Sequence, residues 1–213
     1  STTQTYILEL GNEYIRFYRD NGQILSGGSA YEISSPYLTA ELFDIKFAQS
    51  ADVMYITHPS HKTRKLSRTG HTSWTLAEVD FVNGPYLDTN SSTTTITASA
   101  HTVGTGRTFT ASASTFVSTD VDRLIRFRDG YAKVTGFTSA TVVTVEIIKD
   151  TGSSSASTDW SLGAFSDTTG FPSCVTFFEQ RLVFAATLNN PQTIYFSKSG
   201  DYENMDANIG GTV

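Results

Sequence analysis

Tight-turn signals divide this chain into short, β-prone segments. Residues 5–10 are mainly apolar and β-prone, residues 13–19 form a second expected strand after Gly11-Asn12, and Asp20-Asn21-Gly22 follows. Asn-Gly is a strong hairpin signal, because both positions accept a positive φ. Further strands are expected at 52–57, 65–68, 73–80, 121–128, 131–137 and 141–149, with a hairpin turn at Asp129-Gly130. The pattern predicts an all-β protein.

The composition agrees with a folded β protein. The chain has 14 Phe, 10 Tyr and 38% hydrophobic residues, which is enough to form a core. Only 17% of the residues are charged and the net charge is -6, so the basic surface that general DNA binding needs is missing. Cys174 is the single cysteine and cannot form an internal disulfide; its apolar surroundings predict a buried thiol.

One short helix is expected near residues 39–47. Thr39 is a suitable N-cap, and Leu42, Phe43 and Phe47 would then face inward. No segment is apolar over the length that a membrane span requires.

The composition changes at residue 87. Residues 88–115 are mostly Ser, Thr, Ala and Gly, three stronger strand signals follow, and 151–158 resembles a Ser-rich linker. We expect residues 87–159 to form a small β-barrel or sandwich. This domain would interrupt a larger unit made of residues 1–86 and 160–213.

Two distant segments of that larger unit resemble each other. The run LSRTGH at 66–71 matches FSKSGD at 196–201, and each closes an expected β-hairpin. Such repeats are typical of propeller blades, which stack because one blade cannot bury both faces of its sheet. We therefore expect propeller-like blade hairpins, and a chain that is part of a longer protein.

Several runs resemble the tail nozzle proteins (tail tubular protein B-like) of podoviruses and their prophage relatives. They are YIRFYRDNGQ at 14–23, FAQSADV at 47–53, His58-Pro59, RKLSR at 64–68, FEQRL at 178–182 and SKSGDY at 197–202 with Asn204. The resemblance covers roughly residues 1–86 and 160–206.

The resemblance implies a hexameric ring on a propeller-like platform at the end of a short tail, with a channel through which DNA leaves. The partners would be other tail subunits and tail adaptor proteins, and DNA would pass without specific binding. An acidic channel wall would repel the DNA backbone. The location would be the virion tail, after synthesis in the bacterial cytoplasm. The isolated chain is expected to be a monomer.

The interrupting domain looks like the small barrels that are likened to the catalytic-cysteine half-domain of ubiquitin-activating enzymes. This likeness concerns the fold only, because residues 87–159 contain no cysteine.

Enzymatic motifs are incomplete. Gly104-Thr105-Gly106-Arg107 lacks the Lys-Ser/Thr of a phosphate loop. A sialidase-type box fails because residue 68 is Arg and Trp74 lies one position too late. No Gly-x-Ser-x-Gly elbow occurs. We expect no catalytic residue and no cofactor.

Three histidines near one turn are the conceivable metal ligands. His58, His61 and His71 lie close in sequence, with Asp52 nearby, but the zinc pattern His-Glu-x-x-His is missing. The favoured interpretation is loop histidines in a blade hairpin, with no bound metal.

The remaining candidates are interaction residues. Arg123, Arg126 and Arg128 crowd one strand, where Arg126 and Arg128 share a face and Arg123 takes the other. A solvated strand paired with Glu146 is the favoured interpretation, and a contact to a neighbouring subunit or a glycan is the alternative.

The run Asp201-Tyr202-Glu203-Asn204 is either a turn that closes a blade, which is favoured, or a Ca²⁺ loop.

The favoured function is thus a non-enzymatic component of a tail. A receptor- or glycan-binding module is the alternative, with Phe116, Tyr131 and Phe137 of the interrupting domain as candidate aromatic contacts that could equally belong to its core. A tail-borne hydrolase is the third hypothesis.

Overall fold

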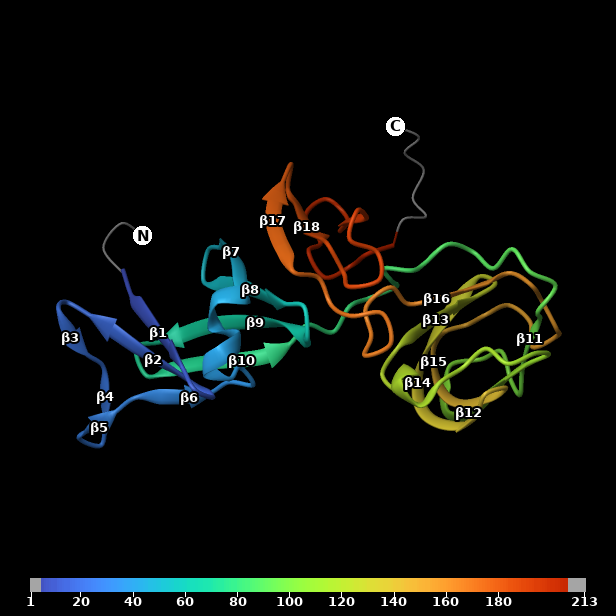
Figure 1. The fold of residues 1–213 in the computed structure, drawn as a ribbon, viewed down its shortest axis with the longest axis horizontal. Helices are drawn as coiled ribbons and strands as arrows, with labels where there is room; N and C mark the ends of the chain where they lie inside the picture. The colour runs from blue at the N-terminus through green and yellow to red at the C-terminus, as the bar shows by residue number, and fades with distance from the viewer. Residues whose placement is uncertain (1–4, 207–213) are drawn as a thin grey trace.

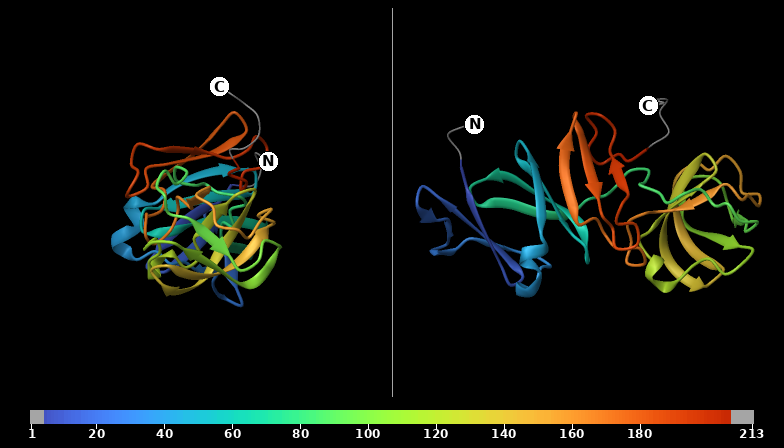
Figure 2. Two further views of the ribbon diagram at one scale, coloured as in Figure 1. Left: turned by 90° about the vertical axis from the view of Figure 1, so that its right-hand side faces the viewer. Right: turned by 45° about the horizontal axis from the view of Figure 1, so that its top comes forward.

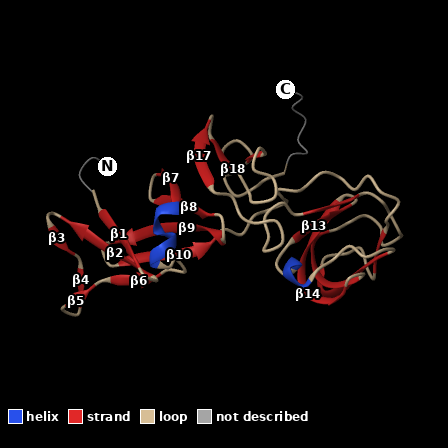
Figure 3. Cartoon of the chain, in the orientation of Figure 1, coloured by secondary structure: helices blue, strands red, loops and turns tan. Residues whose placement is uncertain are grey.

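The computed structural model describes residues 5–206 as an elongated, nearly all-β molecule (Figure 1). The N-terminal sheets lie at one end, a small sheet lies in the middle, and a strongly curled sheet forms the other end (Figure 2). The helical segments of the described chain are the short 3-10 helices η1 (Thr39–Asp44) and η2 (Ser118–Asp120) (Figure 3). The all-β prediction is confirmed.

The first sheet contains β1 (Ile7–Gly11), β2 (Tyr14–Arg19), β3 (Gly22–Gln23) and β6 (Glu32–Ser34), with β2 paired to all three others. The expected hairpin between β2 and β3 forms, but its turn lies one residue earlier than the Asn-Gly signal indicates: Asp20 and Asn21 have positive φ, and Gly22 already belongs to β3 opposite Arg19. A two-stranded hairpin, β4 (Leu25–Ser26) and β5 (Ser29–Ala30), extends from this sheet.

The second sheet is an antiparallel meander of β7 (Lys46–Ser50), β8 (Val53–His58), β9 (His61–Gly70) and β10 (Ser73–Glu78). Its apolar residues pack with those of the first sheet into one core. The fully or almost fully buried members of this core are Ile15, Phe17, Tyr37, Ile56 and Leu66.

The curled sheet is a six-stranded half-barrel in the order β11-β12-β15-β14-β13-β16. Its strands are β11 (Ile96–Ala98), β12 (Gly104–Ala111), β13 (Leu124–Phe127), β14 (Gly130–Ser139), β15 (Val142–Lys149) and β16 (Trp160–Leu162). Alternate residues of these strands fill its core, as expected for a sheet that buries one face. Because β16 pairs with β13, the sheet extends beyond the expected boundary at residue 159.

The middle sheet, β17 (Cys174–Phe178), β18 (Arg181–Ala185) and β19 (Ile194–Phe196), is a second meander. Its inner face shares a core with the preceding part of the chain. Phe177 packs edge-on against Tyr55 of β8, with ring centroids 6.1 Å apart, and Phe184 packs against Phe81 at 5.5 Å. The segments that precede and follow the half-barrel in the sequence are therefore in direct contact with each other.

The two similar runs occupy comparable but not identical places. Leu66 and Phe196 both lie in the third strand of a meander, opposite Met54 and Val183 of the strand before. However, 66–70 stays within β9, whereas the chain leaves β19 after Phe196 and turns at Gly200 with a φ of 74°. The two runs therefore begin in the same strand position of their meanders, but the first run continues along its strand and the second leaves it.

Two details of the predicted helix are wrong. Leu42 packs against the core, but Phe43 and Phe47 are exposed. The helix is too short to present one continuous apolar face, and Phe47 already belongs to β7. The N-cap is Leu38 rather than Thr39.

The prediction of a buried thiol is also wrong, because Cys174 is exposed. It lies on the outer face of β17, whose residues alternate between exposed and half-buried positions.

Candidate functional site

The β8–β9 hairpin brings two histidines together. His58 ends β8 and His61 begins β9, so Pro59-Ser60 form the turn and the two histidines face each other across it. Directly opposed residues of an antiparallel pair project from the same face of the sheet. Their ring centroids are 4.9 Å apart.

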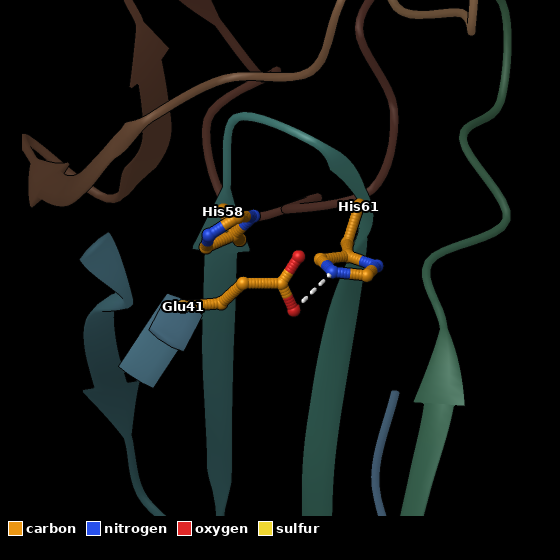
Figure 4. Close-up of side chains that lie close together, drawn as sticks. All are labelled: Glu41, His58 and His61. Carbon is orange, nitrogen blue, oxygen red and sulfur yellow. Dashed lines mark hydrogen bonds and ion pairs between the residues drawn. The ribbon is translucent and has the colours of Figure 1, made fainter. Parts of the chain in front are cut away.

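Glu41 reaches these histidines from η1. Its Oε2 accepts the backbone N–H of Leu38 at 2.8 Å, which closes the first turn of the helix and fixes the direction of the side chain. The carboxylate then lies between the two imidazoles (Figure 4) and contacts His61 Nε2 at 2.9 Å. One ligand atom from each of Glu41, His58 and His61 lies within 4.8 Å of the others.

Burial sets the charge states of this cluster. His58 is 3% exposed, and its desolvation, together with the nearby His61, lowers the pKa of its ring. The Leu38 N–H bond and the contact with His61 lower the pKa of Glu41. These shifts favour the neutral imidazole of His58 and the ionised carboxylate of Glu41, which are the forms that bind metals.

Two buried polar atoms at this hairpin end have no hydrogen-bond partner among the described residues. One is His58 Nε2, because the Ser60 N–H bond at 3.1 Å uses Nδ1. The other is the hydroxyl of Tyr37, whose ring packs edge-on against His61 at 5.3 Å. Burial raises the pKa of Tyr37 to about 12. Buried polar groups normally have a hydrogen-bond partner, and these two atoms, which are among several orphaned ones in the described residues, both lie beside the His58–His61 pair.

The sequence identified only part of this cluster. Asp52 instead pairs with Arg68 at 2.6 Å, and His71 bonds with Tyr6 and Arg19. Glu41 was missed because its capping bond goes to the backbone of Leu38, a residue type that gives no capping signal in the sequence. Hairpin register, rather than an i,i+4 helix spacing, brings the two histidines together.

Arg123 is not a surface residue, which corrects its assignment as a candidate contact. It is 3% exposed and its guanidinium binds Asp120 Oδ1 at 2.6 Å and the carbonyl of Gly163 at 2.8 Å. Asp120 also accepts the Thr168 hydroxyl at 2.7 Å. These bonds fasten the half-barrel to the segment that follows β16.

Arg126 and Arg128 are bound within the half-barrel as well. Arg126 pairs with Asp159 at 2.7 Å and Arg128 donates to the carbonyls of Ser155 and Ala156. The expected pairing with Glu146 does not form, because Glu146 lies opposite Lys133 on another strand pair.

A wide cleft of about 1360 Å³ lies beside Arg126 and Asp159. The outer face of the middle sheet also lines it, through Phe178, Ile194 and Phe196. These three side chains are 57%, 58% and 46% exposed. The cleft therefore joins a charged pair to an uncovered apolar surface.

Asp201 and Tyr202 lie in a turn after β19. Asp201 is exposed and its backbone N–H donates to the Lys198 carbonyl at 3.3 Å, while Tyr202 packs on Phe177 at a centroid distance of 5.0 Å. Glu203 is held by Lys65 at 2.7 Å. The aromatic ring and one of the two carboxylates thus have structural partners within the chain.

Within residues 5–206, no helix has the length and apolar character that a bilayer span requires. Comparison with models of known protein families and with curated proteins finds no match for this chain.

Proposed function

We propose that this chain is a non-enzymatic structural component of a short phage or prophage tail, of the nozzle type. Two lines of support exist. The sequence runs described above resemble that family, and the all-β architecture, two meanders beside a half-barrel, fits the platform with a small β domain that the resemblance implies. The partners would be further copies of the full-length protein in a ring and tail adaptor proteins.

The observation that carries the proposal is the uncovered apolar face of the β17–β19 sheet. Its inner face fills a core, whereas Phe178, Ile194 and Phe196 project outward together. Contiguous exposed apolar residues are typical of surfaces that bind another protein. A structural subunit of a ring requires such a surface, and the adjoining cleft offers room for a segment of a neighbour.

We further propose that DNA passes through a channel of the assembled ring without binding to it. The net charge of -6 supports this. A protein with few cations releases few counterions from DNA and gains little affinity from phosphate contacts.

The glycan-binding alternative loses two of its three aromatic residues. Phe116 and Tyr131 are buried in the half-barrel unit, and only Phe137 is 39% exposed. Sugar binding by stacking needs aromatic faces that are open to the ligand, so we favour the structural role.

Immunogold labelling tests the proposal. Antibodies against this chain should label the distal end of the tail in particles from the strain that encodes it. Label that is missing from all particles, or confined to capsids, would reject it.

A double variant tests the apolar face itself. We expect Phe178→Ser with Phe196→Ser to leave the melting temperature nearly unchanged, because both side chains are already exposed, but to prevent incorporation into tails. Phe43→Ser is a matched control, since Phe43 is an exposed phenylalanine on η1, away from this sheet. Normal incorporation of the double variant would show that another surface makes the contacts.

A further inference from the structure

We propose that Glu41, His58 and His61 form a binding site for a zinc-class transition-metal ion, independent of any role in a tail. Two imidazoles and one carboxylate are a ligand set that zinc sites use, and this set leaves a fourth position for water. The three ligands come from two separate elements, the 3-10 helix η1 and the turn end of the β8–β9 hairpin. A bound ion would link these two elements.

The geometry requires a small closing movement. In a tetrahedral site with bonds of about 2.1 Å, the ligand atoms lie roughly 3.4 Å from one another. Here they lie within 4.8 Å. Rotations of the Glu41 and His61 side chains, which are both partly exposed, bring the pair toward His58 by the remaining ångström or so and open the Glu41–His61 contact, now 2.9 Å, by about half an ångström. Their partial exposure also gives the ion a path from solvent.

The hydrogen bond between Glu41 and His61 occupies the position in which the ion would bind. Glu41 Oε2 and His61 Nε2 are 2.9 Å apart, at hydrogen-bond distance, and an ion that binds His61 Nε2 replaces this bond. Both existing bonds of Glu41 use Oε2, so Oε1 is the oxygen left for a further partner.

His58 supplies the second, independent observation. It is 3% exposed, and its Nε2 is a buried polar atom without a partner among the described residues. Such an atom carries an energetic penalty that a bound ion removes. Its ring lies beside the Glu41 carboxylate, opposite His61 (Figure 4).

Binding has a defined consequence for Ser60. The Ser60 N–H donates to His58 Nδ1, so in this state Nε2 carries the ring proton. If the ion binds Nε2, the proton moves to Nδ1; if it binds Nδ1, it takes the lone pair. In both cases Nδ1 stops accepting the Ser60 N–H bond, and the Ser60 amide reports on occupancy.

The donor types select the metal. Imidazole nitrogen suits zinc, copper, nickel and iron, whereas Ca²⁺ and Mg²⁺ prefer sites made of oxygen ligands. One oxygen donor and two nitrogens therefore favour Zn²⁺ over both of the abundant hard cations.

Isothermal titration of the whole chain with zinc chloride tests the site. We expect one Zn²⁺ per chain, no comparable binding of Ca²⁺ or Mg²⁺, and an affinity at least about tenfold lower in Glu41→Gln and in His61→Gln. Glu41→Gln is isosteric, His61→Gln keeps a polar side chain, and both substitutions fall on partly exposed side chains, so folding is expected to survive them.

His101→Gln is the matched control. His101 also contacts a carboxylate, Asp150 at 3.1 Å, but it belongs to no such group of three ligands among the described residues. Its substitution should leave the zinc affinity unchanged. Equal losses in His101→Gln and His61→Gln, or no saturable binding in the unaltered chain, would overturn the proposal.

Two further measurements separate a built site from surface binding. Zinc at about 100 times its Kd should raise the melting temperature by roughly 5–10 °C. The Ser60 amide should also shift and exchange faster in the NMR spectrum of the zinc-bound chain. A Ser60 amide that does not respond to saturating zinc would place the ion elsewhere and contradict the assignment.

Discussion

Asp120→Ala is expected to lower the free energy of unfolding by about 3–5 kcal/mol, because it leaves the Arg123 guanidinium buried without its counter-charge. The side chains of Arg123 and Asp120 are 3% and 2% exposed. Asp120 also accepts the Val117 N–H at 2.9 Å and the Thr168 hydroxyl at 2.7 Å, and both donors lose this acceptor in the variant, although Thr168 keeps its contact with the Thr119 hydroxyl. Urea denaturation followed by circular dichroism measures the loss.

An exposed ion pair provides the control for this prediction. Arg126 and Asp159 are equally close, at 2.7 Å, but the Asp159 carboxylate is open to solvent. Water screens such a pair, so Asp159→Ala should cost no more than about 1 kcal/mol.

A double substitution tests the reason given for the loss. Asp120→Leu combined with Arg123→Met removes both charges, and it is expected to recover a large part of the stability that Asp120→Ala loses. The coupling energy between the two positions should exceed 1 kcal/mol in a double-mutant cycle. Additive losses would show that the ion pair is not the dominant interaction at this junction.

The local fold could be predicted where short-range chemistry decides it. The Asp20-Asn21-Gly22 run identifies the β2–β3 hairpin, although the turn residues are Asp20 and Asn21 rather than Asn21 and Gly22, and alternation identifies the half-barrel strands. Phe43 and Phe47 show the limit of this reasoning. A helical pattern assigns them to one apolar face, but the helix ends before Phe47 and its core contact is made by Leu42.

The site and the junction depend on contacts that the sequence does not encode locally. Strand alternation places Arg123 on the same face as the apolar Ile125 and Phe127, but it does not indicate a partner for the charge. The burial of this arginine arises because η2 places Asp120 beside it and the chain returns at Gly163. Likewise, Glu41 meets His58 and His61 only after η1 packs near the end of the hairpin. Residues distant in sequence become neighbours through tertiary packing, which local patterns do not report.

Phe127→Ala carries the second large effect, a loss of about 3–5 kcal/mol in the half-barrel. Phe127 is fully buried, and its ring packs against Phe109 at a centroid distance of 5.4 Å. The substitution removes most of an aromatic ring from a core that the curled sheet cannot easily close. Phe137→Ala is the control, because Phe137 lies in the same sheet but is 39% exposed, and its loss should be near 1 kcal/mol or less.

The chain's two tryptophans allow this effect to be located. Trp160 lies directly opposite Phe127 in the half-barrel, whereas Trp74 stacks on Phe17 in the N-terminal core at 4.3 Å. In a Trp74→Phe background, Phe127→Ala should lower the urea midpoint reported by Trp160 by roughly 2 M, taking a slope of about 2 kcal/mol per molar. In a Trp160→Phe background, the midpoint reported by Trp74 should move much less. This difference is expected because Phe127 and Trp74 belong to separate hydrophobic cores. Equal shifts of the two midpoints would instead mean that the half-barrel and the N-terminal sheets unfold as one cooperative unit.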